Sequence, residues 1–167
     1  MRTNLFTILI LIIGVSIGVH HPAKAQIGKR FPSEKKIVTD PVTGVKLTFL
    51  TSTPVRDSKI YQTHNQWTSD GNWVIFRSER VKGEAMAVNE KSGDIVQVSE
   101  GGFTGMLSVA RKSMKLYFMR KTEGDSAKNK LDIIEVDLEK LFADSKSGTL
   151  KRSSVYQRIC GTSASYL

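Results

Sequence analysis

The sequence predicts an all-β protein, and more narrowly a β-propeller represented by about two blades plus the start of a third, an incomplete ring. Three observations lead to this prediction. After residue 40 the chain consists of short apolar or alternating runs divided by turn residues, the pattern of all-β proteins. Two stretches repeat at an offset of 42 residues. A period of about 40–45 residues with four short strands per unit is typical of propeller blades.

The individual elements follow from the same pattern. Residues 26–40 form an extended polar lead-in. Asp70-Gly71 stands between two apolar runs and predicts a hairpin turn, and further turns are expected at 91–94, 101–102 and in the polar loop 121–130. One short amphipathic helix is expected at 138–144. The expected strands are residues 45–51, 60–68, 73–78, 85–89, 95–99, 106–110, 115–120 and 131–136.

The internal repeat supports the assignment to a propeller. Residues 72–78 ("NWVIFRS") align with 114–120 ("MKLYFMR"), and the preceding turns "TSDG" and "ARKS" also match in position. We therefore place blade one at about 40–90, blade two at about 91–140 and the start of blade three at 141–167. A propeller closes with about four to eight blades, so we expect 26–167 to be the N-terminal part of a longer propeller domain. A small stand-alone β-sandwich is the alternative.

The N-terminus has the pattern of a signal peptide. Arg2 precedes an uncharged apolar run at 5–19, and Ala23-Lys24-Ala25 follows with small residues at the two positions that a signal peptidase recognises. A membrane span needs about 20 apolar residues, so the run is short for a retained anchor, which is the alternative. The sequence thus predicts a signal peptide at 1–25 and an exported protein, periplasmic or secreted, with no membrane contact after cleavage.

The mature chain is basic. Without Arg2 and Lys24, the 25 basic residues become 23 against 16 acidic ones, a net charge of +7. Such a protein can meet anionic lipids, nucleic acids or acidic polysaccharides. There is no block of five like charges and no basic helical stripe, so we expect no nucleic-acid partner. Cys160 is the only cysteine, which excludes an internal disulfide, and we expect it to be a buried small residue.

Residues 67–80, "WTSDGNWVIFRSER", resemble the repeat of exported propellers related to the translocation protein TolB. A longer match covers more of the chain. Residues 40–80, beginning "DPVTGVKLTFL", resemble the first blade of the oligogalacturonide lyases, also called oligogalacturonate lyases. The continuation "AMAVNEKSGDIVQVSEG" resembles their second blade. The resemblance extends over most of residues 28–160.

This resemblance implies a seven-bladed propeller that cleaves short galacturonate oligomers from pectin by β-elimination. A base removes the proton at C5 of the uronate and the glycosidic oxygen at C4 departs. In this family a manganese ion draws charge from the neighbouring carboxylate and so acidifies that proton. The implied partner is an acidic oligosaccharide. The alternatives are a non-catalytic TolB-like binding module and a propeller that gates a serine peptidase.

The sequence departs from the lyase pattern at the metal site. The family builds that site from several histidines and a glutamine of later blades, whereas His64 is the only histidine after residue 25. We therefore assign no catalytic residue and no metal ligand within this chain, expect no cofactor bound by it, and expect it to be inactive alone. As an enzyme it is assigned only by resemblance, as a polysaccharide lyase.

Four residues remain as candidates for binding substrate: His64, Gln66, Arg77 and Arg80. If 60–68 is the innermost strand of a blade, His64 and Gln66 face the central channel, and the two arginines suit uronate carboxylates because their fork is bidentate. The alternatives are a histidine satisfied by neighbouring backbone and arginines exposed to solvent. Trp67 and Trp73 are expected to pack between blades, and Asp70 to form a turn.

Overall fold

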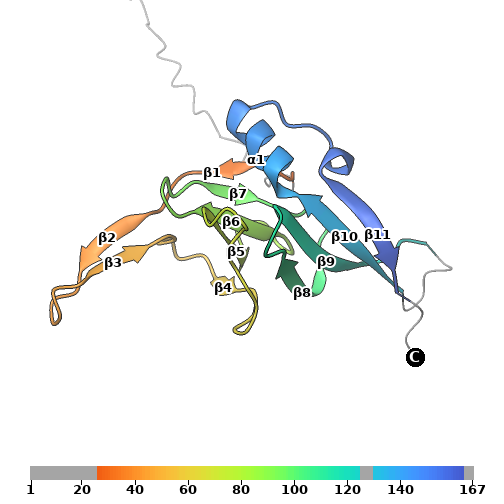
Figure 1. Cartoon of the computed structure of the whole chain (residues 1–167). Helices are drawn as coiled ribbons and strands as arrows, with labels where there is room; N and C mark the ends of the chain where they lie inside the picture. Colours follow the sequence, from red (N-terminus) through yellow and green to blue (C-terminus); the bar gives the residue numbers. More distant parts are fainter. Residues whose placement is uncertain (1–25, 125–129, 164–167) are drawn as a thin grey trace, which may run out of the picture.

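The computed structural model describes residues 26–124 and 130–163, so the signal peptide expected at 1–25 lies outside the described residues. The described chain forms three antiparallel sheets (Figure 1). The first sheet has the order β1-β7-β6-β5-β4, the second has the order β11-β10-β9-β8, and β2 and β3 form a separate hairpin. The all-β prediction is confirmed, while the number of blades stays a prediction.

The first sheet is a meander of four strands with one strand added at its outer edge. β4 (Asp57–Lys59) is the inner edge, followed by β5 (Trp73–Ser78), β6 (Ala85–Asn89) and β7 (Ile95–Gln97). β1 (Arg30–Phe31), from the expected lead-in, pairs with β7. The expected strands at 73–78 and 85–89 are confirmed to the residue, because each is a compact apolar run bounded by turns.

The second sheet is a four-stranded meander of the same kind. It contains β8 (Thr104–Val109), β9 (Lys115–Lys121), β10 (Leu131–Asp137) and β11 (Gln157–Thr162). α1 (Leu138–Ser147) and the 3-10 turn η2 (Ser153–Val155) connect β10 to β11. Residues 141–163 therefore complete the second sheet, and the expectation that 141–167 starts a third blade is corrected to that extent.

The expected strand at 60–68 is wrong. At the inner edge of the first sheet the chain pairs with β5 from Asp57 to Lys59 and then leaves the sheet. It rejoins only at its far end, where Trp67 bridges Val74 and the N–H of Ile75 donates to the carbonyl of Gln66 at 2.8 Å. Between these points the chain carries mostly polar side chains with no period-two pattern, so nothing holds it to the sheet.

Four short strands were not predicted from the sequence: β1, β2 (Lys36–Thr39), β4 and β11. Each is two to six residues long and rich in polar residues. Such segments become strands by pairing with a neighbour and not through a pattern of their own. β2 pairs with β3 (Lys46–Phe49) in the hairpin that projects from the other two sheets (Figure 1).

The 42-residue repeat is present in the hydrogen bonding. The N–H of Thr68 donates to the carbonyl of Trp73 at 2.9 Å, and 42 residues later the N–H of Ala110 donates to the carbonyl of Lys115 at 3.0 Å. The two turns are therefore equivalent, although only the first contains Asp-Gly. This equivalence relates β5 to β9 residue by residue.

The main core lies between the two sheets and beneath α1. Buried side chains from both sheets and the helix, including Ile75, Leu116, Phe118, Ile134 and Leu141, form one cluster. Alternation along β5 places Ile75 in this core, while Phe76 joins a smaller cluster on the opposite face of the first sheet. Complete burial of such a side chain contributes roughly 1.5–3 kcal/mol, so this core holds the sheets together.

α1 begins and ends at well-formed caps. The Asp137 carboxylate accepts from the N–H of Lys140 at 3.1 Å, and Gly148 ends the helix with φ 73°. Phe142 on this helix stacks against Trp73 of β5, with ring centroids 4.0 Å apart. The expectation that Trp73 packs between the sheets is confirmed, whereas Trp67 is 41% exposed. No helix among the described residues is long and apolar enough to span a membrane.

A buried ion cluster fixes the lead-in to the first sheet. Arg80, with 5% of its side chain exposed, donates to Glu34 at 2.7 Å and to Asp57 at 2.5 Å, and also to Ser78 at 2.8 Å. Partial burial would raise the pKa of Glu34, but the Arg80 guanidinium and two backbone N–H groups outweigh it and lower that pKa from 4.5 to about 2. Arg80 therefore joins the lead-in to β4.

We predict that Arg80→Met lowers the free energy of unfolding by about 3 kcal/mol, because it leaves the Glu34 and Asp57 carboxylates without their partner. Arg56→Met is the matched control, since the Arg56–Glu79 pair is exposed and its loss has little effect. Urea unfolding at pH 7 measures both. Equal losses in the two variants would contradict the structural role of Arg80.

The ion pair between Arg80 and Glu34 predicts that the free energy of unfolding falls at acidic pH. The folded pKa of Glu34 is lowered, so its contribution is complete above the ordinary value of 4.5 and is lost as the pH falls through about 2. Urea unfolding of Glu34→Gln and the parent protein across this range should show their stability difference shrinking toward acid. A difference that does not change with pH would contradict this assignment.

Gly93 offers a test of the turn between β6 and β7. Its φ is 76°, and an added Cβ would overlap Ser33 Oγ and lie 2.7 Å from Lys35 Cβ. We predict a loss of about 3 kcal/mol for Gly93→Ala, from the left-handed backbone and the crowding together. Gly44→Ala is the control, because Gly44 has φ 71° with open space around it, and it should cost about 1 kcal/mol. Thermal unfolding that ranks the two equally would contradict the crowding.

Candidate functional site

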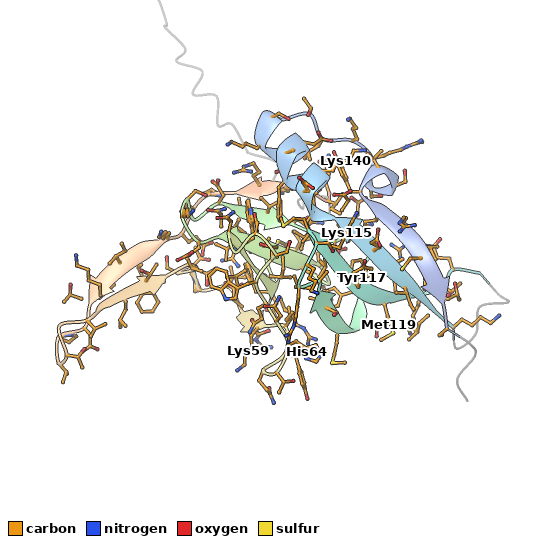
Figure 2. The ribbon with its side chains drawn as sticks, in the orientation of Figure 1. Lys59, His64, Lys115, Tyr117, Met119 and Lys140 are labelled. Atoms are coloured by element: carbon orange, nitrogen blue, oxygen red, sulfur yellow. The ribbon has the colours of Figure 1, made fainter. Side chains whose placement is uncertain are left out.

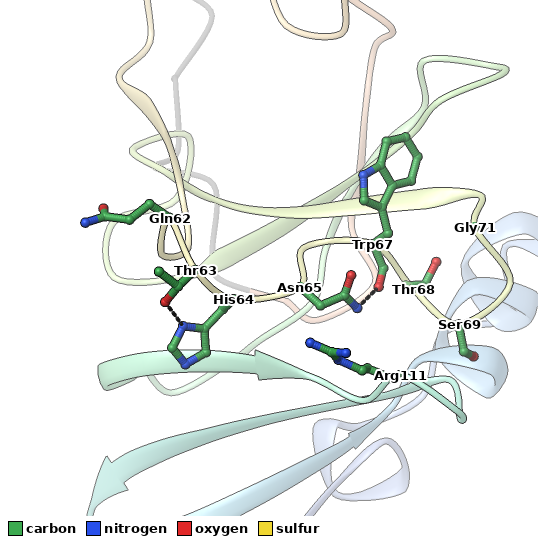
Figure 3. A pocket seen from close by; sticks show the side chains of 9 residues that line it. All are labelled: Gln62, Thr63, His64, Asn65, Trp67, Thr68, Ser69, Gly71 and Arg111. Carbon is green, nitrogen blue, oxygen red and sulfur yellow. Dashed lines mark hydrogen bonds between the residues drawn. The ribbon is translucent and has the colours of Figure 1, made fainter.

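A cavity of about 520 Å³ opens between a loop of the first sheet and a turn of the second (Figure 3). Most of its wall comes from the segment that leaves the inner edge of the first sheet before β5. One residue, Arg111, comes from the turn between β8 and β9. The lining residues are Gln62, Thr63, His64, Asn65, Trp67, Thr68, Ser69, Gly71 and Arg111.

The packing of the two sheets brings these segments together. The loop after β4 and the turn after β8 are equivalent in the 42-residue repeat, since each follows the inner strand of its sheet. Sheets that pack face to face therefore place the two connections next to each other at one end of the core. The cavity is a consequence of this placement and of the extra length of the first loop.

His64 is half-buried at one side of the cavity. Its ring meets Tyr61 edge to face, with centroids 5.0 Å apart, and its Nδ1 lies 3.5 Å from the hydroxyl oxygen of Thr63. Figure 3 shows the imidazole and the Arg111 guanidinium on the same side of the loop, while the indole of Trp67 points away from both. The imidazole and the guanidinium are the ionisable groups of the lining.

The Asp-Gly turn supports the other wall. Asp70 accepts a hydrogen bond from the Thr68 hydroxyl at 2.5 Å and two from Asn72, and Gly71 adopts φ 68°. Burial would raise the pKa of Asp70, but the donors from Thr68 and Asn72 lower it below its usual value. The prediction that Asp70 forms a turn is confirmed, and its carboxylate is engaged in holding that turn.

The four substrate-binding candidates do not come together. His64 lines the cavity, and Gln66 lies in the same loop but outside the lining, with its carbonyl bound to the N–H of Ile75. Arg77 lies toward the other end of β5, next to a separate cavity of about 160 Å³. The guanidinium of Arg80 is engaged by Glu34 and Asp57. Substrate binding by these four residues stays a prediction.

Arg77 occupies a boundary between the two sheets. One of its Nη groups donates to the carbonyl of Gly105 at 2.9 Å, and its guanidinium lies 5.8 Å from the ring of Phe103. Among the described residues its buried Nε has no hydrogen-bond partner. The contacts to Gly105 and Phe103 connect the first sheet to the start of β8.

Arg111 is the residue that sequence reasoning missed. The alignment of "ARKS" with "TSDG" already placed it in the turn equivalent to Thr68–Gly71, beside the loop that carries His64. Because equivalent turns of neighbouring sheets lie side by side, the alignment of these two turns is the sequence signal that points to Arg111. Cys160 also differs from expectation, because it is exposed and not buried.

The lining does not suit a manganese ion. Manganese sites in proteins combine imidazole with carboxylate ligands. The cavity offers one imidazole and a guanidinium, whose fixed positive charge repels a cation. Among residues 26–124 and 130–163, no group of three or more His, Cys, Asp or Glu side chains is placed to hold a metal.

No family model matches the chain, and no curated protein matches it. Solved structures do match in fold. An oligogalacturonate lyase from Vibrio parahaemolyticus matches with a TM-score of 0.55 and 22% sequence identity. The fold resembles part of an oligogalacturonate lyase. An oligogalacturonate lyase in complex with manganese matches with a TM-score of 0.55 and 20% identity. In each case the match covers 70% of this chain and 30% of the lyase.

The resemblance to oligogalacturonate lyases expected from residues 40–80 is thus confirmed at the level of the fold. The chain spans about 30% of the length of these lyases. The manganese complex connects that metal with one of these lyases, and not with the described residues of this chain.

We predict that Asp70→Ala lowers the free energy of unfolding by about 2 kcal/mol, because the turn loses a carboxylate that accepts three hydrogen bonds. Ser69→Ala, an exposed change in the same turn, is the control and should change it by less than about 0.5 kcal/mol. Urea unfolding at neutral pH measures both, and equal values would show that the carboxylate does not hold the turn.

Proposed function

We propose that this chain binds short galacturonate oligomers in the cavity between His64 and Arg111, as part of a protein of the oligogalacturonate lyase type. The observation that carries the proposal is the position of Arg111. Its guanidinium stands at the wall of a polar cavity that contains no carboxylate, in a fold that resembles these lyases. The proposed ligand is an acidic oligosaccharide.

The chemistry of the lining suits such a ligand. A uronate carries one carboxylate per sugar, and a guanidinium binds a carboxylate through two parallel N–H donors. The side chains of Gln62, Thr63 and His64 provide hydrogen-bonding groups of the kind that recognise sugar hydroxyls. Without residues 1–25 the chain has 23 basic and 16 acidic residues, a formal net charge of +7, which favours the approach of a polyanion.

The proposed reaction of the complete protein is β-elimination, in which manganese would stabilise the carboxylate of the uronate that loses its C5 proton. We assign to this chain only binding and orientation of the oligomer. Because the lining does not suit manganese, we derive no step of the elimination from His64 or Arg111. We propose that the described residues alone do not cleave the substrate, and that the protein is exported through residues 1–25.

We predict that digalacturonate shifts the NMR signals of the His64 ring in a saturable titration. Arg111→Met should weaken this binding at least about tenfold, equivalent to about 1.4 kcal/mol, because the carboxylate loses its charged partner. Lys112→Met is the matched control, since Lys112 is exposed in the same turn but does not line the cavity. If both changes weaken binding equally, the effect of Arg111→Met comes from the lost net charge and not from a contact between Arg111 and the carboxylate, which contradicts the proposal.

Two further measurements define the ligand and the reaction. Neutral galactobiose should not compete with digalacturonate, and equal binding of the two would refute the assignment of an acidic sugar. With added manganese, no absorbance from an unsaturated product should develop, and turnover would show that this chain carries catalytic groups of its own. Acidic-sugar binding is also the observation that separates this proposal from a TolB-like module of other specificity.

A further inference from the structure

A second cavity, of about 390 Å³, lies between the outer part of the first sheet and α1. Its walls come from β1, from the start of β5, from the β6–β7 turn and from one side of the helix. The lining residues are Arg30, Trp73, Asn89, Ser92, Asp94, Phe142, Ala143 and Lys146. None of the four substrate-binding candidates lines this cavity, and it shares no lining residue with the cavity at His64.

An aromatic pair lines this cavity. Trp73 and Phe142 stack with an interplanar angle of 15°, so Phe142 holds the indole in a fixed orientation. Phe142 is 8% exposed, whereas Trp73 is only partly buried. Trp73 also packs against the main core, and the part of its indole that lines the cavity offers an apolar surface of the kind on which the C–H face of a sugar ring packs.

Two cationic side chains and one carboxylate, those of Arg30, Lys146 and Asp94, also line the cavity. Arg30 forms an ion pair with Asp94 at 2.6 Å, which fixes its guanidinium while leaving 32% of the side chain exposed. Lys146 is exposed in the last turn of α1, and its ammonium has no ion pair among the described residues. A lysine there also favours the helix C-terminus, a structural role that explains its place on the helix but not its place in the cavity.

The β6–β7 turn contributes Asn89, Ser92 and Asp94 to the lining and is held by its own hydrogen bonds. The Asn89 side-chain oxygen accepts from the N–H groups of Lys91 and Ser92, at 3.0 and 2.9 Å. These two bonds use only the oxygen of the side-chain amide and leave its N–H₂ group as the donor. Gly93 packs against the lead-in so closely that an added Cβ would overlap it, which keeps this wall in place. The lining therefore combines an aromatic pair, two cationic side chains and an amide donor, and these come from β1, β5, β6 and α1.

We propose that this cavity is a second binding site for acidic oligosaccharide, in which a sugar ring packs on Trp73 and its carboxylate meets Lys146 and Arg30. The inference rests on the ligand class of the proposed function and extends it to a different part of the surface. Gly71 lines the first cavity and Trp73 the second, so both open at the same end of β5. A longer oligomer bound at both sites would gain avidity.

The chain contains two tryptophans, so its indole N–H signals report on the site directly. Trp67→Phe assigns the remaining signal to Trp73. In the protein with both tryptophans, digalacturonate should shift the Trp73 signal in a saturable manner. Lys146→Met should weaken that titration about tenfold, equivalent to about 1.4 kcal/mol. Lys140→Met is the matched control, because Lys140 is exposed on the same helix and lies outside the cavity (Figure 2).

The Arg111→Met variant distinguishes binding at the second site from binding at the first. If Arg111→Met abolishes the His64 titration and leaves the Trp73 titration unchanged, the second site stands as an independent one. A Trp73 signal that does not move, or that moves only while Arg111 is present, overturns this inference and leaves the proposed function intact. Conversely, a response of Trp73 without any response of His64 refutes the first site alone.

Two other ligands test the chemistry. Sulfate that shifts Trp73 as strongly as digalacturonate would reduce the site to general anion binding and overturn the inference. If neutral galactobiose binds as well as digalacturonate and its binding is unaffected by Lys146→Met, the carboxylate has no role at this site. That result would also overturn the inference. Digalacturonate selectivity over both ligands, together with the loss in Lys146→Met, is the expected result.

Discussion

The burial of apolar side chains between the two sheets is the constraint on which the rest of the structure depends. Ile75 from the first sheet and Leu116 and Phe118 from the second meet there, and α1 closes the cluster from above in Figure 1. Hydrophobic burial has no direction of its own, so strand pairing and alternation decide which side chains meet. Once the sheets are face to face, the loops at their ends have to lie side by side. The positions of His64 and Arg111 follow from this core, although neither residue belongs to it.

Sequence reasoning succeeded where the chain carries its own pattern. The strands at 73–78 and 85–89, the helix start at Leu138 and the turn at Asp70-Gly71 are local features, determined by alternation, capping and glycine. It failed where structure arises only from contact. The two-residue strand β1 exists because β7 offers it an unpaired edge, and β4 exists because β5 does. Residues of such segments carry no periodicity that a sequence could reveal.

The candidate site was predictable to a similar degree. His64 was selected because it is the one histidine of the described chain, and the structure does place it in a cavity. Arg80 was selected because arginine suits carboxylates, and it does bind carboxylates, but those of Glu34 and Asp57 within the protein itself. The same chemistry serves an internal ion cluster and a ligand site, and only the fold distinguishes them. Arg111 required knowledge of how equivalent turns of neighbouring sheets approach each other.

The equivalence of β5 and β9 has a thermodynamic meaning for the second sheet. Ile75 is wholly buried, and its counterpart 42 residues later is Tyr117. Tyr117 lies on the same face of the second sheet as Met119. Ile133, the cross-strand partner of Met119, is also on this face and is 39% exposed. Tyr117 and Met119 project from this strand in Figure 2. The opposite face of the first sheet is already covered by Phe31 and Leu50. The second sheet therefore has a partly exposed apolar face at Met119 and Ile133, and a molecule that bound the folded chain there would raise its unfolding temperature.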